Sequence, residues 1–183
     1  MKKPIVVNLF GAPGAGKSTG AAYIFSELKQ RGVNAELVTE FAKDKTWEGN
    51  MTALSCQEYV FGKQSYRLAR CRNDVDVIVT DSPLLLSMIY DRNPALGRPF
   101  GQVVLNVFNT YNNLSYYITR VKDYNPKGRN QTAEESDALG EDIKNMLEYH
   151  KIPYEEVEGS ALGYWHIIKD VLERLEDKEF DNE

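Results

Sequence analysis

Short apolar runs alternate along this chain with longer stretches in which apolar residues recur every three or four positions. The short runs predict strands and the periodic stretches predict helices, because each element places its apolar side chains at its own spacing. Strands are predicted at 4–10, 33–39, 75–80, 115–119 and 153–157, and helices at 18–31, 52–72, 134–150 and 162–176. The region 84–112 is also predicted to be helical, with an interruption between Pro94 and Pro99. This order indicates βαβ units and an α/β domain with a parallel sheet.

The first predicted strand leads into a glycine-rich loop. Residues 11–18 read GAPGAGKS and match the phosphate-loop pattern G-x-x-x-x-G-K-[ST], with the required strand before the match and helix after it. Glycines let successive N–H groups point inward, and the positive end of the helix adds to their attraction for phosphate. We expect Lys17 to reach the β and γ phosphates and Ser18 to ligate Mg²⁺. The nucleotide-binding candidates are Gly11, Ala12, Pro13, Gly14, Ala15, Gly16, Lys17, Ser18 and Thr19.

A carboxylate ends the third predicted strand. The run Val77-Ile-Val-Thr-Asp81 places Asp81 at the edge where a parallel sheet binds ligands, and there it can hold Mg²⁺ directly or through water. The alternative is a helix N-cap, because Asp81-Ser82-Pro83 would also start a helix well. Together with the phosphate loop, Asp81 and Ser18 are the metal candidates.

Composition bounds these interpretations. The chain has 183 residues, enough for one domain with a sizeable core, so a single domain is expected over 1–183. No apolar stretch approaches the ~20 residues of a transmembrane helix, and no membrane partner is expected. The net charge of −5 argues mildly against DNA as a partner but leaves room for a local basic groove. Cys56 and Cys71 lack metal-ligand spacing, so reduced thiols in a cytoplasmic protein are expected.

A strongly polar segment follows the fourth predicted strand. Residues 120–135 read RVKDYNPKGRNQTAEE and predict a mobile loop that carries several cations. Phosphoryl transfer spreads negative charge over the phosphate oxygens, so cations that arrive as a loop closes stabilise the transition state. Arg120 and Arg129 are the candidates for this role, with Lys122 and Lys127 behind them. The alternative is a surface loop with routine charge.

The loop GAPGAGKST resembles that of the small nucleoside and nucleotide kinases among the P-loop proteins. This resemblance implies a three-layer P-loop NTPase fold, in which a five-stranded parallel sheet of order 2-3-1-4-5 lies between helices. It also implies ATP and Mg²⁺ as cofactors. In such kinases a small lid follows the fourth strand, which here corresponds to about 120–135.

The stretch after the second predicted strand carries the candidate general base. It reads TEFAKDKTW, and a carboxylate just past a strand end faces the ligand crevice. Glu40 and Trp47 resemble a pair in deoxynucleoside kinases, where the Glu takes the proton from the acceptor hydroxyl; the stretch also resembles the Glu-aromatic-Ala motif of nicotinamide riboside kinases. A positioned base is needed because an alcohol is a poor nucleophile. Asp44 is the alternative candidate for the base. A further alternative is that Glu40 has no catalytic role and is a solvated residue at the start of a helix.

The predicted helix 52–72 carries two amides on an otherwise apolar face, formed by Gln57, Phe61, Gln64, Leu68 and Cys71. A buried amide needs partners, which a nucleobase edge can supply. Deoxynucleoside kinases resemble this arrangement, since they use a Gln on the corresponding helix to bind the base. The alternative places both amides at the rim of the core. The neighbouring face, with Lys63, Arg67 and Arg70, is either a solvated stripe or a contact for an acceptor's phosphate; the acceptor-binding candidates are Asp44, Trp47, Gln57, Gln64 and Arg67.

The chain departs from deoxynucleoside kinases after the third strand, where Thr80-Asp81-Ser82 replaces their usual Glu-Arg-Ser. Most of the chain instead resembles compact P-loop kinases of bacteriophages, some of which are implicated in phosphorylating 5-hydroxymethyluracil in DNA. A monophosphate acceptor would need arginines, and the candidates for it are Arg67, Arg70, Arg72, Arg92 and Arg98.

The leading hypothesis is therefore an ATP-dependent kinase for a hydroxyl of a nucleoside-type acceptor. Modified-base DNA is slightly favoured as that acceptor, and a free deoxynucleoside or deoxynucleoside monophosphate is the alternative. A phage-encoded enzyme would act in the host cytoplasm, and the sequence leaves a homodimer open. A P-loop ATPase switch or motor is the alternative of another class. It predicts a water-activating carboxylate beside Asp81, but Ser82 and Pro83 follow instead.

Overall fold

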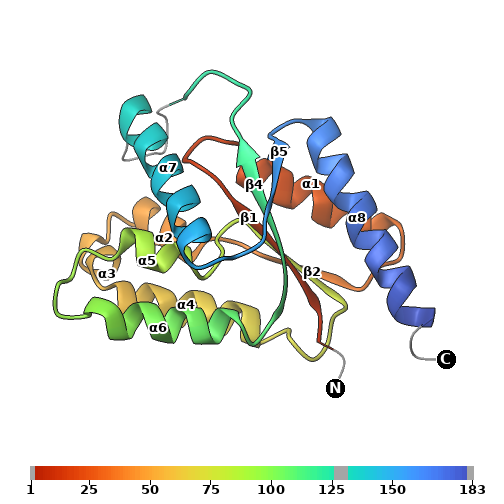
Figure 1. Cartoon of the computed structure of the whole chain (residues 1–183), viewed down its shortest axis with the longest axis horizontal. Coiled ribbons are helices and arrows are strands. Elements are labelled where there is room, and N and C mark those ends of the chain that lie inside the picture. Colours follow the sequence, from red (N-terminus) through yellow and green to blue (C-terminus); the bar gives the residue numbers. More distant parts are fainter. Residues whose placement is uncertain (1–2, 126–131, 181–183) are drawn as a thin grey trace.

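Five parallel strands form the centre of the molecule in the computed structural model, which describes residues 3–125 and 132–180. The strands are β1 (Ile5–Phe10), β2 (Ala35–Val38), β3 (Val77–Thr80), β4 (Asn112–Thr119) and β5 (Glu155–Glu158). They lie in the order β2-β3-β1-β4-β5 (Figure 1), which confirms the predicted sheet. Each neighbouring pair is parallel, and β3 pairs directly with β1 from Ile5↔Val77 to Asn8↔Thr80. The loops that follow these two strands are therefore neighbours at one edge of the sheet.

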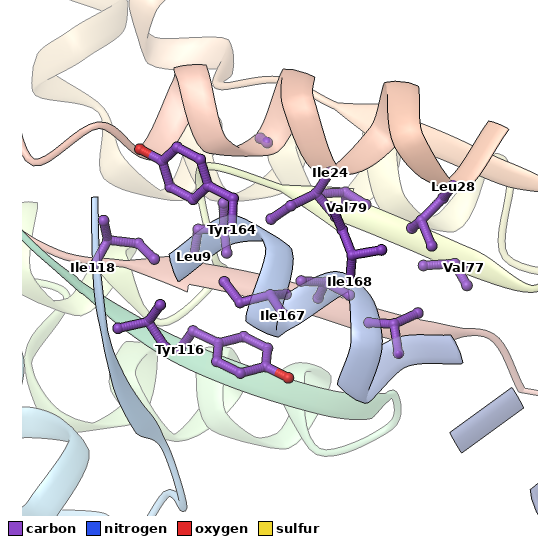
Figure 2. Close-up of a cluster of buried hydrophobic side chains, with 14 of the residues drawn as sticks. Leu9, Ile24, Leu28, Val77, Val79, Tyr116, Ile118, Tyr164, Ile167 and Ile168 are labelled. Atoms are coloured by element: carbon purple, nitrogen blue, oxygen red, sulfur yellow. The ribbon is translucent and has the colours of Figure 1, made fainter. Parts of the chain in front are cut away.

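Helices cover both faces of the sheet and complete the three predicted layers (Figure 1). On β1, Leu9 faces a core built with α1 and α8 (Figure 2), whereas the adjacent Phe10 faces a core built with α4, α6 and α7. This alternation follows from the period of two in a strand. The helices are α1 (Lys17–Gln30), α2 (Phe41–Trp47), α3 (Met51–Ser55), α4 (Gln57–Ala69), α5 (Leu86–Tyr90), α6 (Gly97–Phe108), α7 (Ala133–Tyr149) and α8 (Ala161–Phe180).

The structure corrects the prediction of one long helix over 52–72. The backbone leaves the helical region at Cys56, where φ is −97° and ψ is 86°, so that α3 and α4 are separate helices. The apolar spacing continues across Cys56 and gave no sign of this break. A helix that the sequence analysis did not predict, α2, precedes them. The helical region 84–112 is interrupted as predicted, but the break covers 91–96, since α5 ends at Tyr90 and α6 begins at Gly97 and includes Pro99.

The start of α7 is fixed by a capping box. Thr132 accepts a hydrogen bond from the Glu135 N–H, and the Glu135 carboxylate accepts one from the Thr132 N–H. Within 3–125 and 132–180, no helix combines the length and apolarity that crossing a membrane requires.

Candidate active site

The loop between β1 and α1 is shaped by three glycines with positive φ. Gly11 has φ of 138°, Gly14 of 84° and Gly16 of 102°, values that side-chain-bearing residues rarely adopt. Helix α1 begins immediately afterwards, and it has no acidic residue in its first turn and no side-chain cap. The partial positive charge at its N-terminus is therefore left for an anion.

Two long-range hydrogen bonds brace this loop. The Tyr164 hydroxyl on α8 donates to the Gly16 carbonyl over 3.0 Å, and the buried Ser136 hydroxyl on α7 donates to the Pro13 carbonyl over 2.8 Å. Both contacts join segments more than a hundred residues apart, and both bind the loop to a helix that follows a later strand. The loop is thus held in place by the body of the domain before any ligand binds.

Gly16→Ala is expected to destabilise the protein by roughly 1–3 kcal/mol, the usual cost of a strained backbone position. A Cβ at Gly16 would lie 2.5 Å from the Tyr164 hydroxyl in addition to adopting an unfavourable φ. Urea unfolding measures the change. Gly62→Ala is the matched control, because a Cβ there meets nothing within 4 Å, and alanine in the interior of α4 should stabilise by about 0.5–1 kcal/mol. Equal stability of wild type and Gly16→Ala would contradict the account.

Lys17 and two hydroxyls stand at the start of α1. The Lys17 ammonium donates hydrogen bonds to the Gly11 carbonyl over 2.7 Å and to the Ala12 carbonyl over 3.0 Å, so it lies folded over the loop. Ser18 and Thr19 are exposed in the first helical turn. This arrangement suits a phosphate chain, because an amine and two hydroxyls stand next to a glycine-shaped loop at a helix N-terminus.

Asp81 lies buried at the end of β3, beside the phosphate loop. Its Oδ1 atom is buried and finds no hydrogen-bond partner among the described residues. A buried carboxylate oxygen without a partner is costly, which fits a position meant for a cation or its water shell. Asp81 is not the N-cap of α5, because that position is Leu85. The residues present therefore fit Mg²⁺, which Asp81 and Ser18 would hold between them.

Glu40 occupies the N-cap position of α2, yet its side chain does not cap that helix. Within the part of the chain that the structure describes, no group donates a hydrogen bond to this carboxylate. Its side chain is half-buried, and burial raises its pKa; the nearby Asp81 raises the pKa further, while Lys17 lowers it. Glu40, Lys17 and Asp81 are thus electrostatically coupled, although they follow three different strands.

Glu40→Gln is expected to stabilise the protein at neutral pH. The pKa of Glu40 in the folded chain lies above its ordinary value of 4.5. Between the two values the folded state binds more protons than the unfolded state, so stability falls as the pH rises through that window. The gain of the variant over wild type should therefore be absent below the ordinary pKa and complete above the raised one. Thermal unfolding across this range measures it, and a pH-independent difference would be the contrary result.

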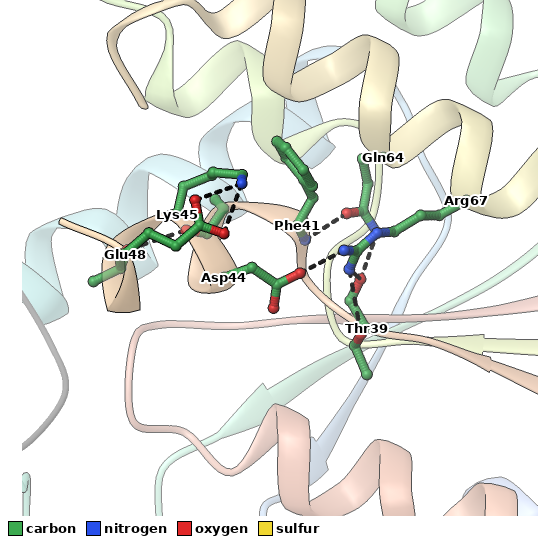
Figure 3. A network of polar contacts seen from close by, with 9 residues as sticks. Thr39, Phe41, Asp44, Lys45, Glu48, Gln64 and Arg67 are labelled. Carbon is green, nitrogen blue, oxygen red and sulfur yellow. Dashed lines mark hydrogen bonds and ion pairs between the residues drawn. The ribbon is translucent and has the colours of Figure 1, made fainter. Parts of the chain in front are cut away.

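The alternative base, Asp44, is already engaged. Its Oδ2 accepts a hydrogen bond of 2.5 Å from Arg67, whose guanidinium also donates to the Thr39 carbonyl over 3.1 Å (Figure 3). An acceptor hydroxyl would have to compete with Arg67 for this carboxylate, whereas no described group donates a hydrogen bond to Glu40. The geometry thus favours Glu40 over Asp44.

The two predicted amides are both buried on α4. Gln64 is held by the main chain of Thr39 and Phe41 (Figure 3), and Gln57 donates to the Leu54 carbonyl over 3.1 Å. Trp47, at the end of α2, is 72% exposed. The candidate acceptor residues thus all lie on α2 and α4, and the structure ties Gln64 to its own chain.

Arg120, the first of the two arginine candidates for the lid, follows β4. The second, Arg129, lies outside the described residues, and so does Lys127. The Arg120 guanidinium forms an ion pair with Asp137, donates to the Ser136 hydroxyl over 3.3 Å and stacks 5.3 Å from the centre of the Tyr124 ring. Because Ser136 also bonds the phosphate loop, Arg120 is connected to that loop through one side chain. Lys122 is exposed.

Sequence reasoning missed three residues of this region. Ser136 and Tyr164 brace the loop from distant helices, and no motif marks either position. Tyr90, at the end of α5, is half-buried, and its pKa is raised to about 12 by burial and by the charge of Glu40. For Tyr90, the sequence signal was weak: an aromatic residue nine positions after Asp81.

A protein-family model described as an AAA domain matches residues 6–161. The chain belongs to this AAA-domain family. Among solved structures, this chain is similar to deoxyadenosine kinase from M. mycoides with bound dATP, with a TM-score of 0.53 and 16% sequence identity. The match covers 93% of this chain and 99% of that one. The chain therefore has the fold of a P-loop kinase. No curated protein matches it.

Proposed function

We propose that the chain is an ATP- and Mg²⁺-dependent kinase that transfers the γ-phosphate of ATP to a hydroxyl of a nucleoside-type acceptor. The observation that carries this proposal is the Glu40 carboxylate, which is free of hydrogen bonds from described residues and coupled to Lys17 and Asp81. A raised pKa makes a carboxylate a better proton acceptor near neutral pH. Such a base beside a phosphate loop suits transfer to an alcohol.

In the proposed reaction, the loop N–H groups and Lys17 bind the phosphates, and Asp81 and Ser18 would hold the metal. The metal held there would supply positive charge that offsets the negative charge of the phosphates. Glu40 accepts the proton of the acceptor hydroxyl as that oxygen bonds to the γ phosphorus. The bond from the γ phosphorus to the bridging oxygen breaks, and ADP leaves with the electron pair. Arg120 would leave Asp137 to stabilise the charge on the transferring group.

For the acceptor we favour a base in DNA, such as 5-hydroxymethyluracil, as in the bacteriophage kinases that the sequence resembles. The outer surface of α2, α3 and α4 supports this choice. Residues 41–70 contain five cations and three acids, a local charge of +2 in a chain of −5. Three of these cations are in ion pairs, and Lys43 and Lys63 form none with a described residue. They could pair with the phosphates of a single strand while its bases stack on aromatic rings. The exposed large apolar residues of this surface are Trp47, Met51, Tyr59 and Tyr66.

A free deoxynucleoside is the alternative acceptor, supported by the match to a deoxyadenosine kinase. A deoxynucleoside monophosphate is less favoured, because Arg67 on α4 and Arg70 at its C-cap already have partners. Arg67 pairs with Asp44, and Arg70 pairs with Glu36 over 3.3 Å. A monophosphate would have to displace one of these carboxylates.

Incubation with γ-labelled ATP and Mg²⁺ tests the proposal. Deoxynucleosides, deoxynucleoside monophosphates and single-stranded DNA containing 5-hydroxymethyluracil are offered in separate reactions, with unmodified DNA of the same sequence as the control. We expect label in the modified DNA. Label in a deoxynucleoside alone would retain the kinase and replace the acceptor, whereas release of free phosphate in every reaction would reject the kinase.

Release of free phosphate in every reaction is the result expected of the second candidate function, an ATPase switch or motor. Membership of an AAA-domain family favours it, and Glu40 is a carboxylate that could activate water instead of an alcohol. The position beside Asp81 that this class needs is filled by Ser82 and Pro83. Hydrolysis that no acceptor diverts would establish the ATPase.

A further inference from the structure

The side-chain amide of Gln64 binds the main chain on both sides of Glu40, the proposed base. Gln64 is buried on α4 with 3% of its surface exposed. Its Oε1 accepts a hydrogen bond from the Phe41 N–H over 2.9 Å, and its Nε2 donates to the Thr39 carbonyl over 3.3 Å (Figure 3). These two main-chain groups flank Glu40 on either side. One side chain therefore holds both peptide groups that set the direction of Glu40.

Arg67, one turn further along α4, holds the same segment. It donates to the Thr39 carbonyl over 3.1 Å and pairs with Asp44, and its guanidinium lies 5.2 Å from the centre of the Phe41 ring. The segment 39–44 is thus tied to α4 at its start, at Phe41 and at Asp44 (Figure 3).

The reason for this arrangement lies at the N-terminus of α2. The first N–H groups of a helix lack partners within it, and the side chain at the N-cap normally accepts from one of them. Glu40 stands at the N-cap but does not do so. Gln64 accepts from the first N–H of the helix, at Phe41, whereas an N-cap side chain accepts from the second or third. The Glu40 carboxylate makes no cap, and the charges of Lys17 and Asp81 act on it.

We propose that Gln64, assisted by Arg67, is a positioning residue that holds the Glu40 carboxylate toward the phosphate site, and does not bind the acceptor. The inference rests on the proposed kinase function. It assigns Gln64 a role different from nucleobase binding, which the sequence analysis proposed. Among the described residues, Gln57 is the amide on this face whose oxygen has no partner and which stays available to an acceptor.

A double-mutant cycle with Glu40→Gln and Gln64→Met tests the inference, using the acceptor that the labelled-ATP panel identifies. Methionine keeps the length of the side chain and removes both hydrogen bonds. In the wild-type background we expect Gln64→Met to lower kcat by about 10- to 10²-fold, since small displacements of a catalytic group have costs of this size. The KM values for ATP and acceptor should stay unchanged. In the Glu40→Gln background the same substitution should change kcat by less than about threefold, because the two residues act as one unit.

An NMR titration of the Glu40 carboxyl gives a readout that needs no acceptor. In the wild type its pKa should lie above 4.5, and in Gln64→Met it should return toward that value as the carboxylate turns to solvent. Ile168→Val, a conservative change in the core under α8, controls for loss of stability alone and should leave both kcat and the Glu40 pKa unchanged.

The outcomes separate the inference from the proposed function. A raised acceptor KM with unchanged kcat would show that Gln64 binds the acceptor, and equal losses of kcat in both backgrounds would show that it acts independently of Glu40. Either result would overturn the inference while the kinase stands. If no acceptor in the panel is phosphorylated, the proposed function fails, and the titration alone then decides whether Gln64 positions Glu40. An unchanged Glu40 pKa in Gln64→Met would reject the positioning role.

Discussion

Lys17→Ala is expected to lower phosphoryl transfer from ATP by about 10²- to 10³-fold, the usual cost of removing one preorganised electrostatic group. The Lys17 ammonium lies over the phosphate loop, bonded to the carbonyls of Gly11 and Ala12. From there it can move to the β and γ phosphates and neutralise the charge that develops between them. No other described lysine lies on this loop. Initial rates with labelled ATP measure the loss.

The fold should survive this substitution, because the loop keeps its bonds to Tyr164 and Ser136. Lys29→Ala is the matched control, since Lys29 is exposed near the end of the same helix and should leave transfer unchanged. Circular dichroism should show equal helix content in both variants. Full transfer by Lys17→Ala would remove the loop from the proposed chemistry.

Glu40→Gln is expected to lower kcat by the ~10²- to 10⁴-fold that a general base contributes. Glutamine keeps the size of the side chain but cannot take the acceptor's proton. ATP affinity should change far less than kcat, because we propose that Glu40 serves the acceptor, and among the described residues no hydrogen bond joins it to the phosphate loop. Steady-state kinetics with each substrate varied in turn separate these effects.

The pH profile gives a second readout of the same residue. In the wild type, kcat should rise with pH through the raised pKa of Glu40, because only the ionised carboxylate accepts a proton. This limb should be absent from Glu40→Gln and present in Glu48→Gln, a control in which the replaced carboxylate lies exposed at the end of the same helix. A change confined to ATP affinity, with the limb retained, would reject Glu40 as the base.

The sequence predicted those parts of the site that depend on local pattern. The phosphate loop and the carboxylates after β2 and β3 follow from apolar runs that end in glycine or in an acid, whereas the strand order was implied by the resemblance to small P-loop kinases. The loop and the two carboxylates each lie within a few residues of their own signal. Parallel strands then bring their ends to one edge of the sheet, which is why distant motifs could be assigned to one site.

The parts that depend on tertiary contacts could not be predicted. A buried amide at Gln64 demanded partners, but the sequence did not show that these would be the Thr39 and Phe41 main chain rather than a nucleobase. The break at Cys56 is a change of backbone direction within an unbroken apolar pattern. Ser136 and Tyr164 touch the loop only because α7 and α8 pack beside it, and such contacts leave no mark on the local sequence.

The most direct test of the central claim is a crystal structure with a non-hydrolysable ATP analogue and Mg²⁺. The account predicts the β and γ phosphates within hydrogen-bond reach of the N–H groups of residues 14–19. It also predicts the metal between Ser18 and Asp81, with the Glu40 carboxylate facing the γ phosphate across an open space. A nucleotide bound elsewhere, or a γ phosphate directed away from Glu40, would contradict it.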